Sequence, residues 1–304
     1  MTSGVAVFEL NDPLIERVRS VEPEARPRVS VCIPCRNEAA TIGTIVSQIR
    51  SRLMDVPRPL VDELLVMDDG SVDTTALVAA AAGATVVRVS EVMPGAGPAW
   101  GKGNALWASV AASSGDVVVW CDGDLTSFTP AYVERLVAPF VLDHRIAFVK
   151  GFYERPLDAA GEGGGRNTEL VARPLLSLFF AELASVRQPL GGEYAATRAV
   201  LEQLPFPTGY GVEIALLIDA WRRIGAPRMA QVDLGVRRHR HQPLHDLAAQ
   251  ALEIQHAVLS RVGVDSSLLA ATPILHQPGR SPRRVNCGER PPLVSVDAYQ
   301  SRIS

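Results

Sequence analysis

The chain has 304 residues, 47% of them hydrophobic, so it can bury one large core and lacks the composition of a disordered protein. The formal net charge is -3, which excludes a global basic field for holding nucleic acid or a membrane surface. The first twenty residues contain no basic region followed by a long apolar run, so we expect no secretory signal and a cytoplasmic protein. Four cysteines are too few for a disulfide framework, and we expect reduced thiols.

After a polar lead, residues 1–28, the chain alternates short apolar runs with helical patterns. Strands are predicted at residues 29–34, 63–68, 85–89, 117–121 and 146–152. Helices are predicted between them, at residues 39–53, 74–82, 104–112 and 130–141. Continuous Val, Ile and Leu strands separated by helices indicate a doubly wound α/β unit with a mostly parallel sheet covered on both faces. We expect residues 29–155 to form this unit.

The pattern changes after a Gly-rich stretch that begins near residue 156. Helices are predicted at residues 170–185, 212–224 and 245–262, with a short strand at 230–234. We expect residues 156–270 to be a helical part of the same domain. Residues 271–304 are rich in Pro, Arg and Ser and poor in apolar positions, which predicts an extended or partly mobile tail.

Polar side chains collect where the predicted strands end. They are Arg36, Asn37 and Glu38 after the first strand, Asp68 and Asp69 after the second, and Asp122 and Asp124 after the fourth. In open α/β sheets ligands bind at the carboxyl ends of the strands, near the point where strand order reverses. The sequence therefore predicts a binding site at this edge of the sheet.

The run VVVWCDGDL ends a buried strand with Asp122, Gly123 and Asp124. Mg²⁺ and Mn²⁺ prefer such carboxylate oxygens, and glycine leaves room for the close approach of a diphosphate. The alternative is a solvated turn, since Asp-Gly pairs are common in turns. The position after a central strand favours metal binding, because unpaired carboxylates at a buried strand end cost several kcal/mol unless a cation neutralises them.

Lys102 lies between two glycines at a predicted helix start. The stretch is no P-loop, because Ala96 stands where that motif has its first glycine and Gly103 follows the lysine. Helix starts favour anions, so Lys102 is a candidate diphosphate contact. The alternative is a surface lysine in a flexible loop.

Two later stretches are candidate binding loops. GGGRNTE presents backbone N–H groups with Arg166 and Thr168, which suits a phosphate or carboxylate, although Thr168 is also a candidate helix N-cap. The basic run RRHRH, residues 237–241, has too few histidines or aromatic partners for a metal buffer or a nucleic-acid surface. One of its histidines is a possible third ligand for the cation at Asp122 and Asp124.

Together these motifs resemble one family. PCRNEAATI, VMDDGSVDTT, GKGNALW, VVVWCDGDL, GGGRNTELVARPLL, QPLGGEYAA, GYGVEIALLID and LGVRRHRHQPL, spread over residues 29–262, are similar to those of the glucosyl-3-phosphoglycerate synthases of actinobacteria. These are retaining glycosyltransferases with the GT-A fold, related to the mannosyl-3-phosphoglycerate synthases. The resemblance implies transfer of glucose from UDP-glucose to the 2-hydroxyl of 3-phosphoglycerate, a Mg²⁺ or Mn²⁺ cofactor and a homodimer.

The resemblance also implies roles for individual residues. The nucleotide sugar would be held by Pro34, Cys35, Arg36, Glu38, Asp69, Lys102, Asp122 and Gly123. The metal would be held by Asp124 and His239, with Asp122, and the catalytic set would be Asp124, Lys102, Glu213 and His239. The acceptor would be held by Gly165, Arg166, Thr168, Tyr210 and His241.

The chain departs from this family's pattern at three positions. Gly123 and Gly191 stand where serine is frequent, and His241 stands where asparagine contacts the acceptor. A partly protonated imidazole can still bind a phosphate or carboxylate. The alternatives left open are a mannosyl-3-phosphoglycerate synthase that uses GDP-mannose, a polyprenyl-phosphate glycosyltransferase, and a catalytically silent module that binds a sugar nucleotide. The polyprenyl-phosphate enzymes normally offer an amphipathic or membrane segment at the C-terminus, which this tail lacks.

Overall fold

The computed structural model describes residues 4–154, 165–237 and 244–303. Its centre is an eight-stranded sheet with the strand order β1-β9-β6-β7-β5-β2-β3-β4. The strands are β1 (Ala6–Val7), β2 (Val29–Cys35), β3 (Glu63–Asp68), β4 (Thr85–Arg88), β5 (Val117–Trp120), β6 (Phe148–Glu154), β7 (Tyr194–Thr197) and β9 (Met229–Val236). The expectation of a mostly parallel doubly wound sheet is confirmed. Within the eight described strands of this sheet, β7 runs antiparallel to its neighbours β5 and β6, and all other neighbouring pairs are parallel.

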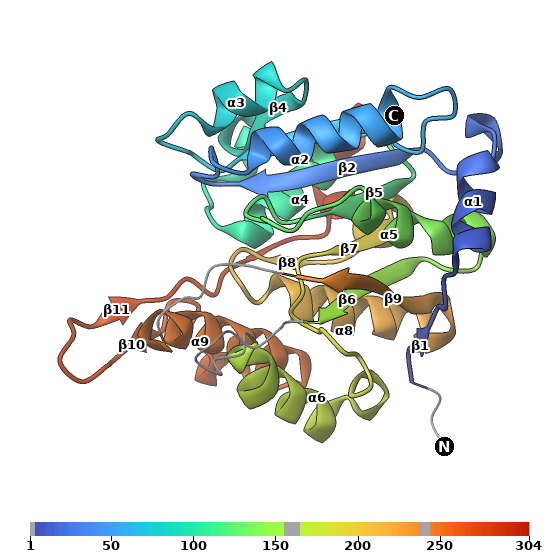
Figure 1. Ribbon diagram of the computed structural model, residues 1–304. Coiled ribbons are helices and arrows are strands. Elements are labelled where there is room, and N and C mark those ends of the chain that lie inside the picture. Colours follow the sequence, from blue (N-terminus) through green and yellow to red (C-terminus); the bar gives the residue numbers. More distant parts are fainter. Residues whose placement is uncertain (1–3, 155–164, 238–243, 304) are drawn as a thin grey trace, which may run out of the picture.

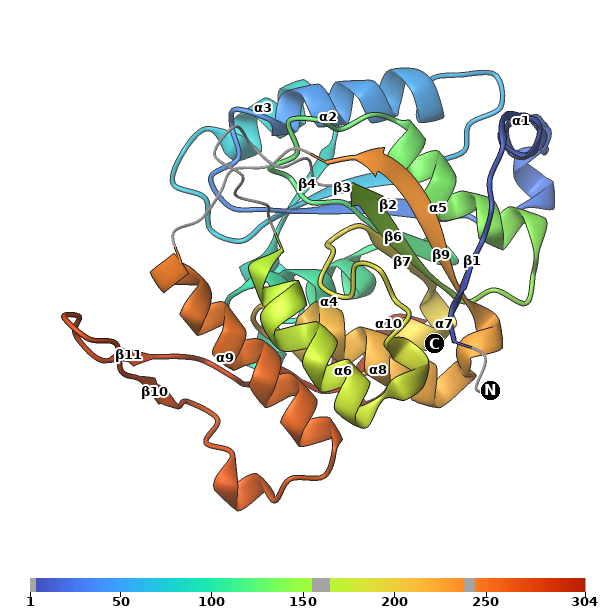
Figure 2. The ribbon, with the colours of Figure 1, turned by 60° about the horizontal axis from the view of Figure 1, so that its bottom comes forward.

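Helices cover both faces of the sheet (Figure 1). They are α1 (Asp12–Ser20), α2 (Ile42–Ile49), α3 (Thr75–Ala81), α4 (Lys102–Ala112), α5 (Ala131–Leu142), α6 (Arg173–Phe179), α7 (Arg198–Leu201), α8 (Val212–Ile224), α9 (Leu244–Arg261) and α10 (Asp297–Ile303). One apolar core joins α1, α2 and α5 to the sheet, and a second core joins α4, α8 and α9 to the other face. Figure 2 shows α6, α8 and α9 grouped on that second side. Strands buried on both faces explain why β2 and β5 are continuous apolar runs.

The strand β7 was not predicted from the sequence, although this strand lies between β5 and β6 in the middle of the sheet. Its sequence, YAAT, is short, and its two alanines disfavour a strand while Tyr and Thr favour one, so the local signal is weak. Burial against the neighbouring strands decides the structure of this segment. Because β9 pairs with β6, the helical second half contributes a strand to the same sheet as the first half.

The tail is largely extended, but it also contains regular structure that the sequence did not predict. It contains a hairpin of β10 (Ile274–Leu275) and β11 (Arg283–Arg284), the strand β12 (Glu289–Arg290) paired with β8 (Phe206–Pro207), and α10. The Arg290 side chain donates to Asn104 Oδ1 at 2.8 Å, and Trp107 Nε1 donates to the Pro291 carbonyl oxygen at 2.8 Å. Polar contacts with α4 therefore hold a segment that has few apolar positions. The hairpin projects beyond α9 (Figure 1).

No helix of the described part of the chain combines the length and apolar character needed to cross a bilayer.

Candidate active site

A cavity of about 360 Å³ opens at the carboxyl ends of β2, β3 and β5, where the sequence predicted a site. It is lined by Pro34, Cys35, Arg36, Glu38, Asp69, Gly101, Lys102, Ala105, Asp122, Gly123, Asp124 and Tyr210. All eight residues that the resemblance assigned to the nucleotide sugar are among them. Residues from five separate stretches of sequence meet here, and three of these stretches follow parallel strands that end at the same edge.

Hydrogen bonds between loops shape the base of this cavity. The Thr41 hydroxyl, just before α2, donates to the Gly123 carbonyl oxygen at 2.6 Å. Asn37 adopts a left-handed backbone, with φ of 61°, and its side chain accepts a hydrogen bond from the Val72 N–H at 2.9 Å. Asparagine tolerates this conformation better than most residues do. The loops after β2, β3 and β5 are thereby fixed to one another.

The start of α4 carries Lys102 into the cavity. Gly101 has φ of 110°, and its N–H donates to Asp69 Oδ2 at 3.1 Å. A side chain at Gly103 would collide with the Pro207 carbonyl, so glycine allows α4 to pack directly on β8. The lysine is therefore a fixed residue at a helix N-terminus, and the reading of a surface lysine in a flexible loop is wrong.

Lys102 and Asp122 form the centre of a buried charge network. Lys102 Nζ lies 2.6 Å from Asp122 Oδ1 and 2.7 Å from Glu213 Oε1. Burial lowers the pKa of Lys102, but Asp122 and Glu213 raise it more, so the pKa stays well above its usual range. Burial likewise raises the pKa of Asp122, and the opposing effect of its two cations lowers it below the usual range. Both groups are therefore charged at neutral pH.

Arg237, which follows β9, is the second cation on Asp122. Its Nη2 donates to Asp122 Oδ2 at 2.8 Å, and its Nη1 donates to Glu193 Oε2 at 2.8 Å and to Tyr153 Oη at 2.7 Å. The sequence did not assign Arg237, Glu193 or Tyr153 to the site. Two of them stood in quoted motifs, since Arg237 opens RRHRH and Glu193 lies in QPLGGEYAA, but only the fold shows that they meet.

Asp124 is the carboxylate that remains available for a ligand. Its side chain is 47% exposed, and among the described residues the nearest cation, Arg237 Nη2, is 3.7 Å from Oδ1. Burial and the neighbouring Asp122 raise the pKa of Asp124. A cation bound here would relieve both effects, so the oxygen donors fit Mg²⁺ or Mn²⁺. Within residues 4–154, 165–237 and 244–303 no cluster of three His, Cys, Asp or Glu ligands is present, and His239 lies outside these residues.

The predicted acceptor residues are not all gathered at this cavity. Tyr210 lines it, whereas Arg166 and Asn167 line a separate cavity of about 540 Å³ between the segment that precedes α6 and α9. Thr168 is buried and begins a π-helical turn, Thr168–Ala172, so the alternative reading of Thr168 as an N-cap is wrong. Gly165 directly precedes this segment, and His241 lies outside the described residues.

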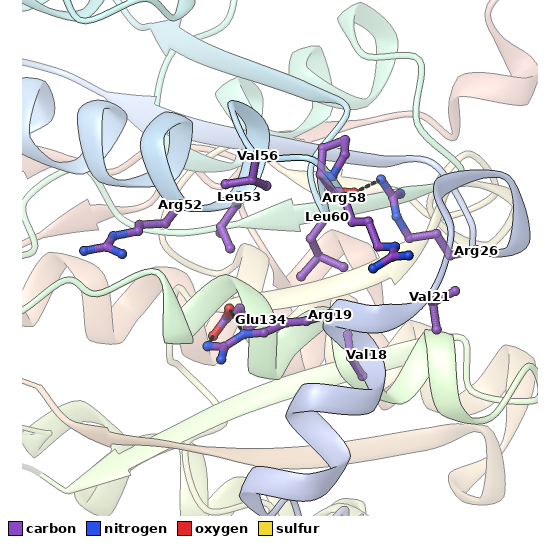
Figure 3. Close-up of a pocket in the computed structure, with 11 residues that line it drawn as sticks. Val18, Arg19, Val21, Arg26, Arg52, Leu53, Val56, Arg58, Leu60 and Glu134 are labelled. Carbon is purple, nitrogen blue, oxygen red and sulfur yellow. Dashed lines mark hydrogen bonds and ion pairs between the residues drawn. The ribbon is translucent and has the colours of Figure 1, made fainter.

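Another cavity, of about 220 Å³, lies at the opposite, amino edge of the sheet (Figure 3). Arginines line it, but three of them already bind carboxylates: Arg19 binds Glu134, Arg26 binds Asp62, and Arg58 binds Glu22. None of the predicted site residues lines it.

Comparisons with known proteins agree with the fold. Residues 30–209 match the model of "Glycosyl transferase family 2". A glucosyl-3-phosphoglycerate synthase of Mycolicibacterium smegmatis is 44% identical over 88% of this chain and 89% of its own length. That of Petrotoga mobilis is 41% identical over 91% of this chain and 89% of its own length.

Solved structures extend this agreement to three dimensions. A glucosyl-3-phosphoglycerate synthase from Mycobacterium tuberculosis in complex with phosphoglyceric acid has a TM-score of 0.84 at 40% identity, covering 97% of this chain and 99% of its own. The same enzyme in complex with Mn²⁺, UDP-glucose and phosphoglyceric acid has a TM-score of 0.82 at 41% identity, covering 95% and 97%. The chain therefore belongs to glycosyl transferase family 2 and, within it, to the glucosyl-3-phosphoglycerate synthases.

Proposed function

We propose that this chain transfers glucose from UDP-glucose to 3-phosphoglycerate. The observation that carries the proposal is the cavity at the carboxyl edge of the sheet, where Lys102 and Arg237 fix Asp122 while Asp124 remains half exposed. The shape and charges of this cavity suit a nucleoside diphosphate sugar. Relatives over most of the chain have been solved with UDP-glucose and phosphoglyceric acid, which supports the choice of donor and acceptor.

The enzyme uses Mg²⁺ or Mn²⁺, as the solved relatives that contain these ions with UDP indicate. Asp124 is the residue we assign as a direct ligand, with Asp122 beside it, and the resemblance adds His239, which lies outside the described residues. When bound, the cation neutralises diphosphate charge as a Lewis acid. Asp122 contributes differently from Asp124, because both of its oxygens already accept hydrogen bonds from cations of the protein.

Lys102 stabilises the leaving diphosphate. The phosphate oxygen gains negative charge as the glycosidic bond breaks, and a preorganised donor aimed at it contributes about 3 to 4 kcal/mol in enzymes where such a group has been removed. Lys102 is held by Asp122 and Glu213 at the N-terminus of the eleven-residue helix α4, where the dipole also favours an anion. Because its position is fixed before the substrate binds, little reorganisation is needed.

We propose that the glucose is transferred with retention of the α-anomeric configuration. Glu213, the acid of GYGVE, is 3% exposed and forms an ion pair with Lys102, which makes it a poor free nucleophile. Front-face attack, in which the leaving phosphate oxygen takes the acceptor proton, then accounts for retention. A covalent glucosyl-enzyme trapped at Glu213 or another acid would contradict this route, and the anomeric proton signal of the product reports the configuration.

The acceptor site is proposed from the resemblance. Gly165, Arg166 and Thr168 would hold the phosphate of 3-phosphoglycerate, while Tyr210 and His241 would line the region between acceptor and sugar. Arg166 lines the cavity beside α9, which supports its role, whereas Thr168 is buried and is assigned from the resemblance alone. Arg166→Ala should raise the KM for 3-phosphoglycerate and leave the KM for UDP-glucose unchanged.

The oligomeric state and location are proposed on the same basis. A homodimer is expected from the family resemblance, and the adjacent exposed side chains of Leu178 and Phe179 on α6 offer apolar surface for a subunit contact. Light scattering of the purified chain tests the dimer. A cytoplasmic location follows from the phosphorylated metabolites that the reaction consumes, and cell fractionation tests it.

A panel of donors and acceptors tests the proposed function. UDP-glucose and GDP-mannose are each offered with 3-phosphoglycerate or without an acceptor, in Mg²⁺ or Mn²⁺, and release of the nucleoside diphosphate is measured. We expect release from UDP-glucose that depends on 3-phosphoglycerate. Release that depends on 3-phosphoglycerate and occurs with GDP-mannose but not with UDP-glucose would identify the mannosyl enzyme instead. No release from either donor would indicate a silent binding module.

A further inference from the structure

The chain has only two lysines, Lys102 and Lys150, among thirty lysines and arginines. Arginine therefore supplies nearly all of the positive charge. Lys150 is buried and Lys102 is partly buried, and both belong to the same group of charged side chains around Asp122 and Glu213. An ammonium is a compact point charge, whereas a guanidinium is a larger planar fork, so the two are not interchangeable in a tightly packed site.

Lys150 lies on β6 behind the donor cavity and does not line it. It is 1% exposed, and its Nζ donates to the Gly191 carbonyl oxygen at 2.6 Å. The same Nζ lies 4.2 Å from the centre of the Tyr194 ring, which adds a cation–π contact. No carboxylate is in direct contact with this ammonium among the interactions of the described residues.

Such an ammonium is costly to bury. Burial lowers the pKa of Lys150 to about 8, a shift that Glu213, Glu193 and Asp122 oppose and that Lys102 increases. A buried ammonium without a carboxylate in direct contact tends to destabilise a fold, even where it has a hydrogen bond and a cation–π contact. The stability of the fold alone therefore does not explain why this lysine is present.

The loop that Lys150 holds lies against Asp122. A side chain at Gly192 would collide with the Asp122 carboxylate, so the backbone of this loop packs directly on the acid. Gly192 is next to Gly191, whose carbonyl oxygen accepts the hydrogen bond from Lys150. The position of this backbone limits where the Asp122 carboxylate can lie between Lys102 and Arg237.

We propose that Lys150 is a positioning residue for the transfer reaction: it fixes the Gly191–Gly192 loop against Asp122 and thereby holds the carboxylate in place. This inference rests on the proposed function. It assigns Lys150 no contact with either substrate. A displacement of about 1 Å at a reacting group can cost as much as a hundredfold in rate, so the loss of this support should appear in turnover.

Lys150→Met tests the proposal, because methionine keeps the length of the side chain and removes the donor and the charge. Arg26→Met is the matched control. Arg26 also has a side chain that is 1% exposed and carries a buried charge, but it lines the cavity at the amino edge of the sheet (Figure 3), whereas Asp122 lines the cavity at the carboxyl edge. Release of UDP and thermal unfolding are measured for both variants and for the wild type, at a temperature where all three are folded.

For Lys150→Met we expect kcat to fall by about ten- to a hundredfold, with the KM for UDP-glucose within about threefold of the wild type. Arg26→Met should lower the melting temperature and leave kcat unchanged. A kcat of Lys150→Met within about twofold of the wild type would overturn the proposal. An equal fall in kcat for Arg26→Met would also overturn it, since a general loss of stability would then explain both variants.

Gly192→Ala provides a second variant in case Lys150→Met does not fold. The added methyl group collides with Asp122 from the loop side, so we expect a similar fall in kcat. Gly191→Ala, whose methyl group would meet Tyr153 Oη at 3.3 Å, should be much milder. Equal activity of Gly192→Ala and the wild type would contradict the role of the loop.

The two lysines also give a spectroscopic readout. Protein labelled with isotopic lysine has two lysine side-chain signals, which the Lys102→Met and Lys150→Met variants assign. We expect UDP with Mg²⁺ to shift the position of the Lys150 signal. An unchanged position of this signal at saturating UDP would contradict the proposal. A wild-type chain that releases no UDP from UDP-glucose would overturn both the proposed function and this inference, whereas an active wild type with an equally active Lys150→Met would overturn the inference alone.

Discussion

The two edges of the sheet handle buried charge in opposite ways. At the amino edge each acid is matched: Asp62 accepts from Arg26 and from the Val29 N–H, and Glu134 accepts two hydrogen bonds from Arg19. At the carboxyl edge Asp122 is shared by two cations, while Asp124 has no cation closer than 3.7 Å among the described residues. Matched pairs tie the chain together, whereas a shared and partly unmatched group is suited to receive a charged ligand.

The two edges also differ in their buried polar atoms that lack a hydrogen-bond partner. Around the carboxyl edge these atoms include Glu193 Oε1, Tyr194 Oη and Arg237 Nε. At the amino edge they include Arg26 Nε. Unsatisfied buried groups cost about 1 to 3 kcal/mol each. The carboxyl edge therefore carries an energetic cost that a ligand, a cation or ordered water would relieve.

Lys102→Met should have the largest effect on turnover. It removes the donor from the leaving diphosphate and leaves Glu213 buried without its ion pair, so we expect kcat to fall by about 10²- to 10³-fold. Arg58→Ala, an exposed cation at the amino edge, is the control and should keep wild-type kcat. Rates of UDP release that differ by less than about threefold between the two variants would remove the functional distinction between the edges.

Gly123→Ala should have the next largest effect. The added Cβ would lie 2.6 Å from Cys35 Sγ and 3.2 Å from the Pro34 carbonyl oxygen, so the loop between Asp122 and Asp124 must shift. We expect activity to fall by about tenfold. Cys35→Ala removes the sulfur, so the double variant should recover part of the loss, and the coupling is read from a double-mutant cycle of kcat/KM. Additive effects would show that Cys35 and Gly123 do not share this space.

Arg26→Met should separate stability from activity. Removing one partner of a buried ion pair leaves Asp62 uncompensated, so we expect the free energy of unfolding to fall by about 3 kcal/mol. Denaturant unfolding measures the loss, and kcat should not change while the protein is folded. A stable but slow variant would contradict the assignment of this edge to structure.

The amino edge should also give a small pH effect on stability. Burial raises the pKa of Asp62, but its hydrogen bonds with Arg26 and the Val29 N–H lower it below the usual value. A lowered pKa in the folded state means that the stabilisation is present above the ordinary value of about 3.9 and is lost as the pH falls through the folded value. Asp62→Asn should therefore flatten the acid limb of a curve of melting temperature against pH. An unchanged acid limb would show that other carboxylates control it.

The sequence predicts elements well where local pattern and burial agree. The helix at residues 212–224 is found with the predicted bounds, because its apolar positions repeat with helical spacing and Gly225 ends it. The segment YAAT of β7 carries no such pattern and is a strand only because β5 and β6 flank it. The packing of the tail was not predicted, because Arg290 and Pro291 are held by polar contacts with α4 that no local signal reveals.

The sequence predicted those residues of the donor cavity that directly follow a strand. Asp69 and Asp122 stand at such ends, so parallel topology brings them together, and Lys102 was predicted from its place at a helix start. Arg237 and Lys150 could not be assigned in this way, since each acts on residues more than forty positions away through contacts that only the packed sheet creates. His239 and His241 lie outside the described residues, and their roles stay predictions.

The central claim is that the carboxyl edge serves a metal-bound sugar nucleotide rather than the stability of the fold. Its most direct test is turnover of Asp124→Ala with UDP-glucose, Mg²⁺ and 3-phosphoglycerate, with Asp143→Ala, a turn residue paired with Arg145, as the matched control. We expect Asp124→Ala to lose about a hundredfold or more in UDP release without a lower melting temperature, while Asp143→Ala keeps full activity. Undiminished turnover by Asp124→Ala would contradict the account.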